Sequence, residues 1–331
     1  MKVFVDANIL LDLYKFSETD LKELEKLCEC VGGGRIELLT SRHVVHEFYK
    51  NRERVIAEAF NKFKSSRIEI HEPNIARSYD KCGELRKLAN QASKAKKSLE
   101  AQIARDINNE SLPSEKIINR LLSVLTVGEV DDLTYERAKH RCAIGHPPGK
   151  NGSLGDAISW EWLLHQELGS NNHRVVLLSS DRDFQSELHP KSLKQFLKKE
   201  WSENQHCEII LKTSFSSFLG EFMPEIELVD EMAKEHSIEL LETSHSFKMT
   251  HDAIENLRTY EEFSKHEVER MIRAYLENNQ IMSILRDFDV KQFAIRLVSL
   301  PCRDDELRSL LEDALQDLDN EEGRGDCCQN I

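Results

Sequence analysis

The chain has 331 residues and a net charge of −14, with hydrophobic residues at 40% and charged residues at 31%. This length predicts two domains rather than one, and the apolar content is sufficient for buried cores. No apolar run reaches the roughly 18 residues of a membrane span, and the N-terminus lacks the residue order of a signal peptide. We therefore expect a soluble, cytoplasmic protein without a membrane partner. The 8 cysteines include no C-x-x-C pair, which disfavours structural zinc.

Strand-like and helix-like segments alternate over the first two thirds of the chain. Strands are expected at 2–5, 35–40, 67–73, 174–180 and 207–213. Helices are expected at 17–30, 41–63, 154–168 and 191–201, with a polar helical stretch at about 75–125 that Pro113 interrupts. Beyond about Pro224 the strand signals fade, and residues 251–279 and 302–318 show helical spacing.

This alternation predicts an α/β fold with a parallel sheet. The expected domains are an α/β domain at 1–220 with a helical insertion at about 55–125, a smaller all-α domain at 221–318, and a flexible tail at 319–331. The acidity is concentrated late in the chain, because residues 221–331 carry 27 Asp/Glu and only 12 Lys/Arg. The charge of the whole chain therefore says little about what the N-terminal part binds.

Acidic residues occupy equivalent places around the predicted sheet. Asp6 ends the first strand and Asp181 ends the fourth, and the carboxyl ends of parallel strands share one edge, where ligands bind. Glu47 and Asp156 lie early in helices that begin at that edge, and Asp183 follows Asp181 by two residues. We therefore expect these side chains to reach one cleft.

Each acid also has a purely structural interpretation. Asp6 could cap a turn, Asp156 could be an acid in the first turn of a helix, Glu47 could be solvated, and Asp181 could open a turn. Taken together, four carboxylates in one cleft would repel one another unless a cation compensates them. Oxygen ligands of this kind suit Mg²⁺ or Mn²⁺.

Four short segments resemble the acidic motifs of PIN-domain nucleases, in that family's order: "VFVDANIL", "HVVHEF", "GDAISWEWL" and "LLSSDRDF". The resemblance covers about residues 1–220. The segment "HPPGKNGSLGDAISW" makes it closest to the larger bacterial PIN-like proteins with a PPG…GD…W segment. These proteins often carry an Asp a few residues after PPG, where this chain has Lys150, Asn151 and Gly152.

The resemblance implies that Asp6, Glu47, Asp156 and Asp181 are catalytic and bind the metal, that Asp183 is a further metal ligand, and that Asn8 is a polar residue near the site. It implies hydrolysis of phosphodiester bonds with Mg²⁺ or Mn²⁺, with RNA favoured over DNA as substrate. The resemblance also allows a role as a regulated toxin or defence effector. In such a role the protein could bind a regulatory protein partner or form a homo-oligomer. The alternative is a catalytically inactive PIN-like scaffold that binds nucleic acid or protein.

Basic residues could contact the phosphate backbone of a nucleic acid. Seven Lys/Arg lie between Arg42 and Arg67, and seven more between Lys81 and Arg105. The candidate nucleic-acid contacts near the predicted site are these basic residues together with the polar Asn8: Asn8, Arg42, Lys50, Arg52 and Lys150. A solvated helix face explains the same pattern, so both interpretations stay open.

Overall fold

The computed structural model describes residues 1–66, 68, 74–76, 79–149, 153–168, 174–189, 191–302 and 304–325. The chain forms two compact units. The first comprises residues 1–14, 27–177 and 195–210, and the second comprises 15–26, 178–194 and 211–331. None of the described helices combines the length and apolar character needed to cross a membrane. Most of the strand expected at 67–73 lies outside the described residues.

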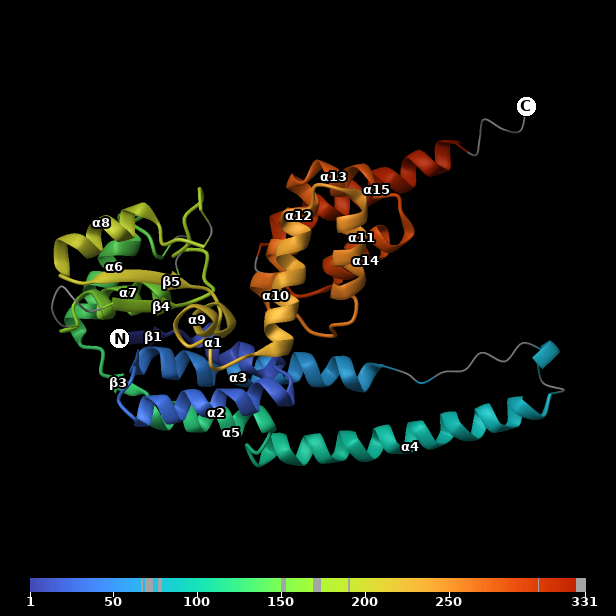
Figure 1. The fold of residues 1–331 in the computed structure, drawn as a ribbon, viewed down its shortest axis with the longest axis horizontal. Helices are drawn as coiled ribbons and strands as arrows, with labels where there is room; N and C mark the ends of the chain where they lie inside the picture. Colours follow the sequence, from blue (N-terminus) through green and yellow to red (C-terminus); the bar gives the residue numbers. More distant parts are fainter. Residues whose placement is uncertain are drawn as a thin grey trace. The chain divides into compact units, whose positions relative to one another are not determined.

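A five-strand parallel sheet is the framework of the fold (Figure 1), and the predicted α/β class is confirmed. The strands are β1 (Lys2–Val5), β2 (Glu37–Ser41), β3 (Thr126–Gly128), β4 (Arg174–Leu178) and β5 (Glu208–Lys212), in the order β3-β2-β1-β4-β5. Val3 lies opposite Leu38, and Thr40 lies opposite Val127. The central strands β1 and β4 are apolar and almost wholly buried, as expected of strands covered on both faces.

The helices that lie between β1 and β5 in the sequence come from the segments that connect the strands. They are α1 (Ala7–Asp12), η1 (Leu13–Lys15), α2 (Glu18–Gly32), α3 (Arg42–Ser65), η2 (Asn74–Ala76), α4 (Asp80–Asn108), α5 (Pro113–Val124), α6 (Asp132–Ala143), α7 (Leu154–Leu164) and α8 (Gln195–Asn204). Helix α3 packs against both α1 and α7, and α6 packs against α7. Every residue of α7 from Ala157 to Leu164 is buried, so this helix lies inside the first unit.

The expected helical insertion consists of α4 and α5, with Pro113 at the first position of α5. Strand β3, which the sequence did not reveal, follows α5 directly and pairs with β2. Arg52 of α3 forms a salt bridge with Glu115 of α5, and both side chains are largely buried. This ion pair joins the insertion to α3.

All the elements that follow β5 in the described part of the chain are helices, which confirms the expected all-α C-terminal region. Its helices are α9 (Phe215–Phe222), α10 (Val229–Glu242), α11 (Phe247–Leu257), α12 (Lys265–Glu277), α13 (Asn279–Ser283), α14 (Phe288–Ser299) and α15 (Asp305–Gly325). Tyr275, Met271 and Phe293 are among the residues at the centre of its apolar core. Helix α15 extends into the expected tail at 319–331, and residues 326–331 lie outside the described residues. The predicted domain boundary at 220 stays a prediction.

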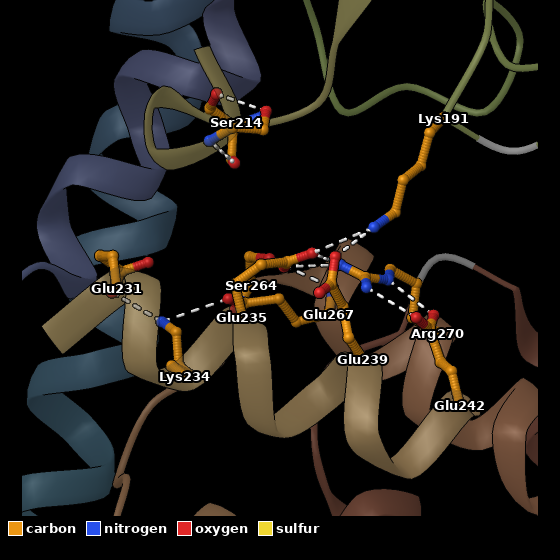
Figure 2. Close-up of polar contacts among 11 residues, drawn as sticks. Lys191, Ser214, Glu231, Lys234, Glu235, Glu239, Glu242, Ser264, Glu267 and Arg270 are labelled. Carbon is orange, nitrogen blue, oxygen red and sulfur yellow. Dashed lines mark hydrogen bonds and ion pairs between the residues drawn. The ribbon is translucent and has the colours of Figure 1, made fainter. Parts of the chain in front are cut away.

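Buried ion pairs link α10 to α12 (Figure 2). The Lys234 ammonium lies 2.7 Å from Glu231 and 3.2 Å from Glu267, and its side chain is only 3% exposed. Burial alone would lower the pKa of Lys234, but the two carboxylates more than offset that effect and raise it. Burial raises the pKa of Glu231 to about 7, even though Lys234 opposes the shift. The backbone N–H of Glu231 also donates to Asp20 of α2.

The raised pKa of Glu231 predicts a specific pH dependence of stability. The folded chain keeps the Glu231 proton up to about pH 7, whereas the unfolded chain releases it near the ordinary value of 4.5. Between about pH 5 and about pH 8 the wild type should therefore lose about 2 kcal/mol of unfolding free energy relative to Glu231→Gln. Urea denaturation at several pH values measures this difference.

Glu255→Gln, which changes an exposed carboxylate on α11, is the matched control and should leave the pH profile unchanged. Lys234, Glu267 and Asp20 face Glu231 and are electrostatically coupled to it, so the difference between the two proteins measures the titration of this cluster. A constant difference between wild type and Glu231→Gln across this pH range would contradict the assignment.

Candidate active site

Asp6 lies at the junction between β1 and α1, and its side chain is 4% exposed. It is the N-cap of α1: one carboxylate oxygen accepts from the Ala7 N–H at 2.7 Å, and the other accepts from the Asn8 amide at 2.8 Å. The Thr40 hydroxyl donates to the carbonyl of Val5, which ties the end of β1 to β2. The carboxylate is thus fixed at the sheet edge that the sequence predicts.

Glu47 of α3 and the first turn of α7 lie close together. A β-carbon built on Gly155 would be 3.3 Å from both the Glu47 carboxylate and the His43 ring. Asp156 is the next residue, half-buried, and its carboxylate accepts from the Ser153 hydroxyl at 2.5 Å. Burial lowers the pKa of His43. A β-carbon contact of this length is tighter than most, so the glycine at position 155 lets α7 approach the Glu47 side chain closely.

Aromatic packing fixes α7 against the sheet. A β-carbon on Gly128 would be 2.4 Å from the Trp162 ring, so only glycine fits at the end of β3. The Trp162 indole N–H donates to the carbonyl of Glu129, and its ring lies 5.8 Å from that of Phe4 in β1. Trp162 therefore contacts the ends of both strands, which makes it a core residue rather than a base-stacking one.

A buried arginine holds the PPG segment to α7. Arg141 of α6, 4% exposed, donates to Glu161 at 2.7 Å, to the carbonyl of Pro147 at 2.6 Å and to Glu200. The Trp160 indole N–H donates to the other oxygen of Glu200. The sequence did not reveal this network, because its members are spread over 60 residues and each one alone resembles a surface charge.

The PPG segment itself turns sharply. Gly149 has φ of +120°, and a β-carbon there would be 2.8 Å from the Cys142 sulfur. A glycine is therefore required by conformation and by space. Lys150, predicted to contact nucleic acid, lies outside the described residues, as do Asn151 and Gly152.

Asp181 follows β4 by three residues, and β4 is the neighbour of β1 in the sheet. The Asp181 N–H donates to the Ser179 hydroxyl, and the Asp181 carboxylate accepts from the Asp183 N–H at 2.9 Å. Both acids belong to the second unit, where this turn fixes their backbone. Their role together with the acids of the first unit stays a prediction.

The candidate phosphate-binding residues on α3 differ in their surroundings. Arg42 is 46% exposed and lies 3.1 Å from Glu129, and Lys50 is exposed. Arg52 is only 16% exposed, and Glu115 and the carbonyl of Ile107 accept its hydrogen bonds. Its guanidinium is therefore engaged in holding the helical insertion to α3.

The candidate ligands are carboxylates, which is the ligand type that suits a hard divalent cation. Asp6 in particular is a carboxylate kept out of bulk water, a position that a cation would stabilise. Within the described part of the chain, no three His, Cys, Asp or Glu side chains are grouped closely enough to hold a metal ion. The donor types thus fit Mg²⁺ or Mn²⁺, and the ligand set remains a prediction.

Replacing Arg141 should destabilise the first unit severely. Arg141→Met would leave the Glu161 carboxylate, 7% exposed, without its cation and would also free Glu200. Breaking a buried pair in this way costs about 3 kcal/mol or more, which chemical denaturation would measure. Lys139→Met on the same helix, which breaks a solvent-exposed pair with Glu136, should cost far less. Equal losses in the two variants would show that the Arg141 network does not stabilise the fold.

Comparison with known proteins gives one match. The family model described as "PIN domain" matches residues 3–184, a stretch that contains all five predicted metal ligands. No curated protein matches the chain significantly, and no solved structure does. The matched stretch spans more than half of the chain and includes the β1–α1 junction, Glu47 of α3 and the start of α7. The chain therefore belongs to the PIN domain family.

Proposed function

We propose that this protein is a metal-dependent nuclease that hydrolyses phosphodiester bonds. PIN domains are generally metal-dependent nucleases. The observation that carries the proposal is the buried Asp6 carboxylate at the end of β1, in a domain where Glu47 lies beside the first turn of α7. The five predicted acidic ligands all lie within the stretch that matches the family, which also supports the proposal.

In this proposal Asp6, Glu47, Asp156 and Asp181 hold Mg²⁺ or Mn²⁺, with Asp183 as a further ligand. The bound ion would lower the pKa of a water molecule and neutralise charge on the phosphate. Asn8 orients Asp6 through its 2.8 Å hydrogen bond, and Gly155 leaves room for the Glu47 carboxylate. The Arg141 network ties α7, at Glu161, to the PPG segment that precedes Asp156 in the sequence.

RNA is the proposed substrate, on the family resemblance. Arg42 and Lys50 lie on α3 together with Glu47, so a phosphate backbone could contact them beside the site. A role as a toxin or defence effector rests on the same resemblance. It would require restraint by a regulatory protein or by assembly with further copies.

Cleavage of labelled RNA and DNA panels tests the proposal. Wild type should cut at least one single-stranded RNA with Mg²⁺ or Mn²⁺, and EDTA should stop the reaction. Asp156→Asn should reduce the rate by at least about 100-fold, because it removes a ligand charge and leaves the shape unchanged. Asp132→Asn, in the first turn of α6, changes an exposed acid and should cut at the wild-type rate. Cleavage by Asp156→Asn at the wild-type rate would refute the site.

Thermal melting separates metal binding from catalysis. A metal at about 100 times its dissociation constant adds roughly 2.7 kcal/mol to a protein that binds it only when folded. This should raise the wild-type melting temperature by about 5–10 °C in Mn²⁺ relative to EDTA. Asp6→Asn should keep the cap, since Asn caps a helix as well as Asp does, yet lose most of that rise.

An equal metal response in wild type and Asp6→Asn would limit Asp6 to its capping role. A wild type with neither metal response nor cleavage would favour the alternative of an inactive PIN-like scaffold.

A further inference from the structure

The turn that carries Asp181 and Asp183 also carries an arginine between the two acids. The Asp181 carboxylate accepts from the Asp183 N–H at 2.9 Å, and the Arg182 carbonyl accepts from the Gln185 N–H at 3.0 Å. We call residues 181–183 the acidic turn. These hydrogen bonds give it a defined backbone conformation, from which the Arg182 side chain extends.

Arg182 bonds the start of α15. Its guanidinium donates to the Asp304 carboxylate at 2.9 Å. The other oxygen of Asp304 accepts from the Leu307 N–H at 3.0 Å, which is the arrangement of a helix N-cap. Leu307 belongs to the apolar core of the C-terminal helices. Arg182 is thus joined to a carboxylate that the first turn of α15 holds in place.

A second carboxylate approaches Arg182 from α12. Glu269 is only 2% exposed, and one of its oxygens lies 3.9 Å from the Arg182 guanidinium. Helix α12 packs against α15, and Met271 and Leu311 contribute to the same apolar core. Arg182, Asp304 and Glu269 all belong to the second unit. The acidic turn is therefore anchored at the junction of two packed helices of that unit.

We propose that Arg182 is a positioning residue, which anchors the acidic turn to the α12–α15 junction so that the C-terminal helices set the geometry of two metal ligands. The inference rests on the proposed nuclease function, in which Asp181 and Asp183 hold the ion. Replacing a residue that orients metal ligands from outside typically costs about 10–100-fold in metal affinity. The C-terminal helices would then act on the site through Asp304 and Glu269 without supplying a ligand.

An ion pair that only stabilises the second unit is the competing explanation. The Arg182 side chain is 38% exposed and that of Asp304 is 32% exposed, so their pair contributes little to the free energy of unfolding. Metal ligands, by contrast, must be held within about 0.5 Å of their productive geometry. A small shift of the acidic turn therefore changes metal affinity even where it leaves the fold intact, and the two explanations predict different measurements.

Calorimetric titration of the full chain with Mn²⁺ is the first measurement. Arg182→Met removes the charge and should raise the dissociation constant at least about tenfold. Arg182→Lys keeps a cation and should recover most of that loss. Asp304→Asn keeps the cap of α15 but removes the partner charge. Added to Arg182→Met it should have little further effect, because the two residues act through one contact.

Lys191→Met is the matched control, because it removes another cation of the segment that follows β4. The Lys191 side chain is 67% exposed and pairs with Glu239 of α10, so the control also breaks a contact with the C-terminal helices. It should change the Mn²⁺ dissociation constant by less than about twofold, since the pair is exposed and distant in sequence from the acidic turn.

Hydrogen exchange in EDTA provides a second measurement that needs no metal. The Asp183 amide, which bonds the Asp181 carboxylate, should exchange on the order of tenfold faster in Arg182→Met and at the wild-type rate in Lys191→Met. Equal exchange in wild type and Arg182→Met would overturn the proposal. Faster exchange with an unchanged Mn²⁺ dissociation constant would overturn it too, and would leave the proposed metal site standing. A wild type that binds no Mn²⁺ would refute the proposed metal site and this inference with it.

Discussion

A buried carboxylate at the end of a buried strand constrains the first unit more than any other feature. Removing an ionised group from water costs several kcal/mol unless nearby donors or charges compensate it. Asp6 accepts from the Ala7 N–H and the Asn8 amide, and these contacts fix the direction in which the chain leaves β1. Helix α1 then packs against α3, which also contacts α7. The dual role of Asp6, as helix cap and proposed metal ligand, follows from this position.

Helix α7 provides the second fixed point, and it is held from two directions. Trp162 lies against Phe4 and fills the space above Gly128, while Arg141 binds Glu161 and the PPG segment. The proposed nuclease function would need its metal ligands to lie on rigid elements. The first turn of α7 meets that requirement because the rest of the helix is surrounded by protein.

The sequence predicted the elements that local pattern determines and missed those that distant contacts determine. Strands β1 and β4 are apolar runs closed by Asp6 and Asp181, so both the strands and the acids were visible. Strand β3 is three residues long, and its end depends on Trp162, which lies over 30 residues away. Arg52 looked like a phosphate ligand because nothing near it in sequence reveals Glu115, its partner 63 residues later.

The acidity of the C-terminal third has a physical explanation within the second unit. Arg270 binds Glu235 and Glu242, and Lys234 lies between Glu231 and Glu267, so many of the acids are paired where helices meet. Such acids are already satisfied and contribute little to long-range attraction, because their partners cancel the field. The net charge of this part already includes these partners, so only the excess of 27 acids over 12 bases would attract a basic surface.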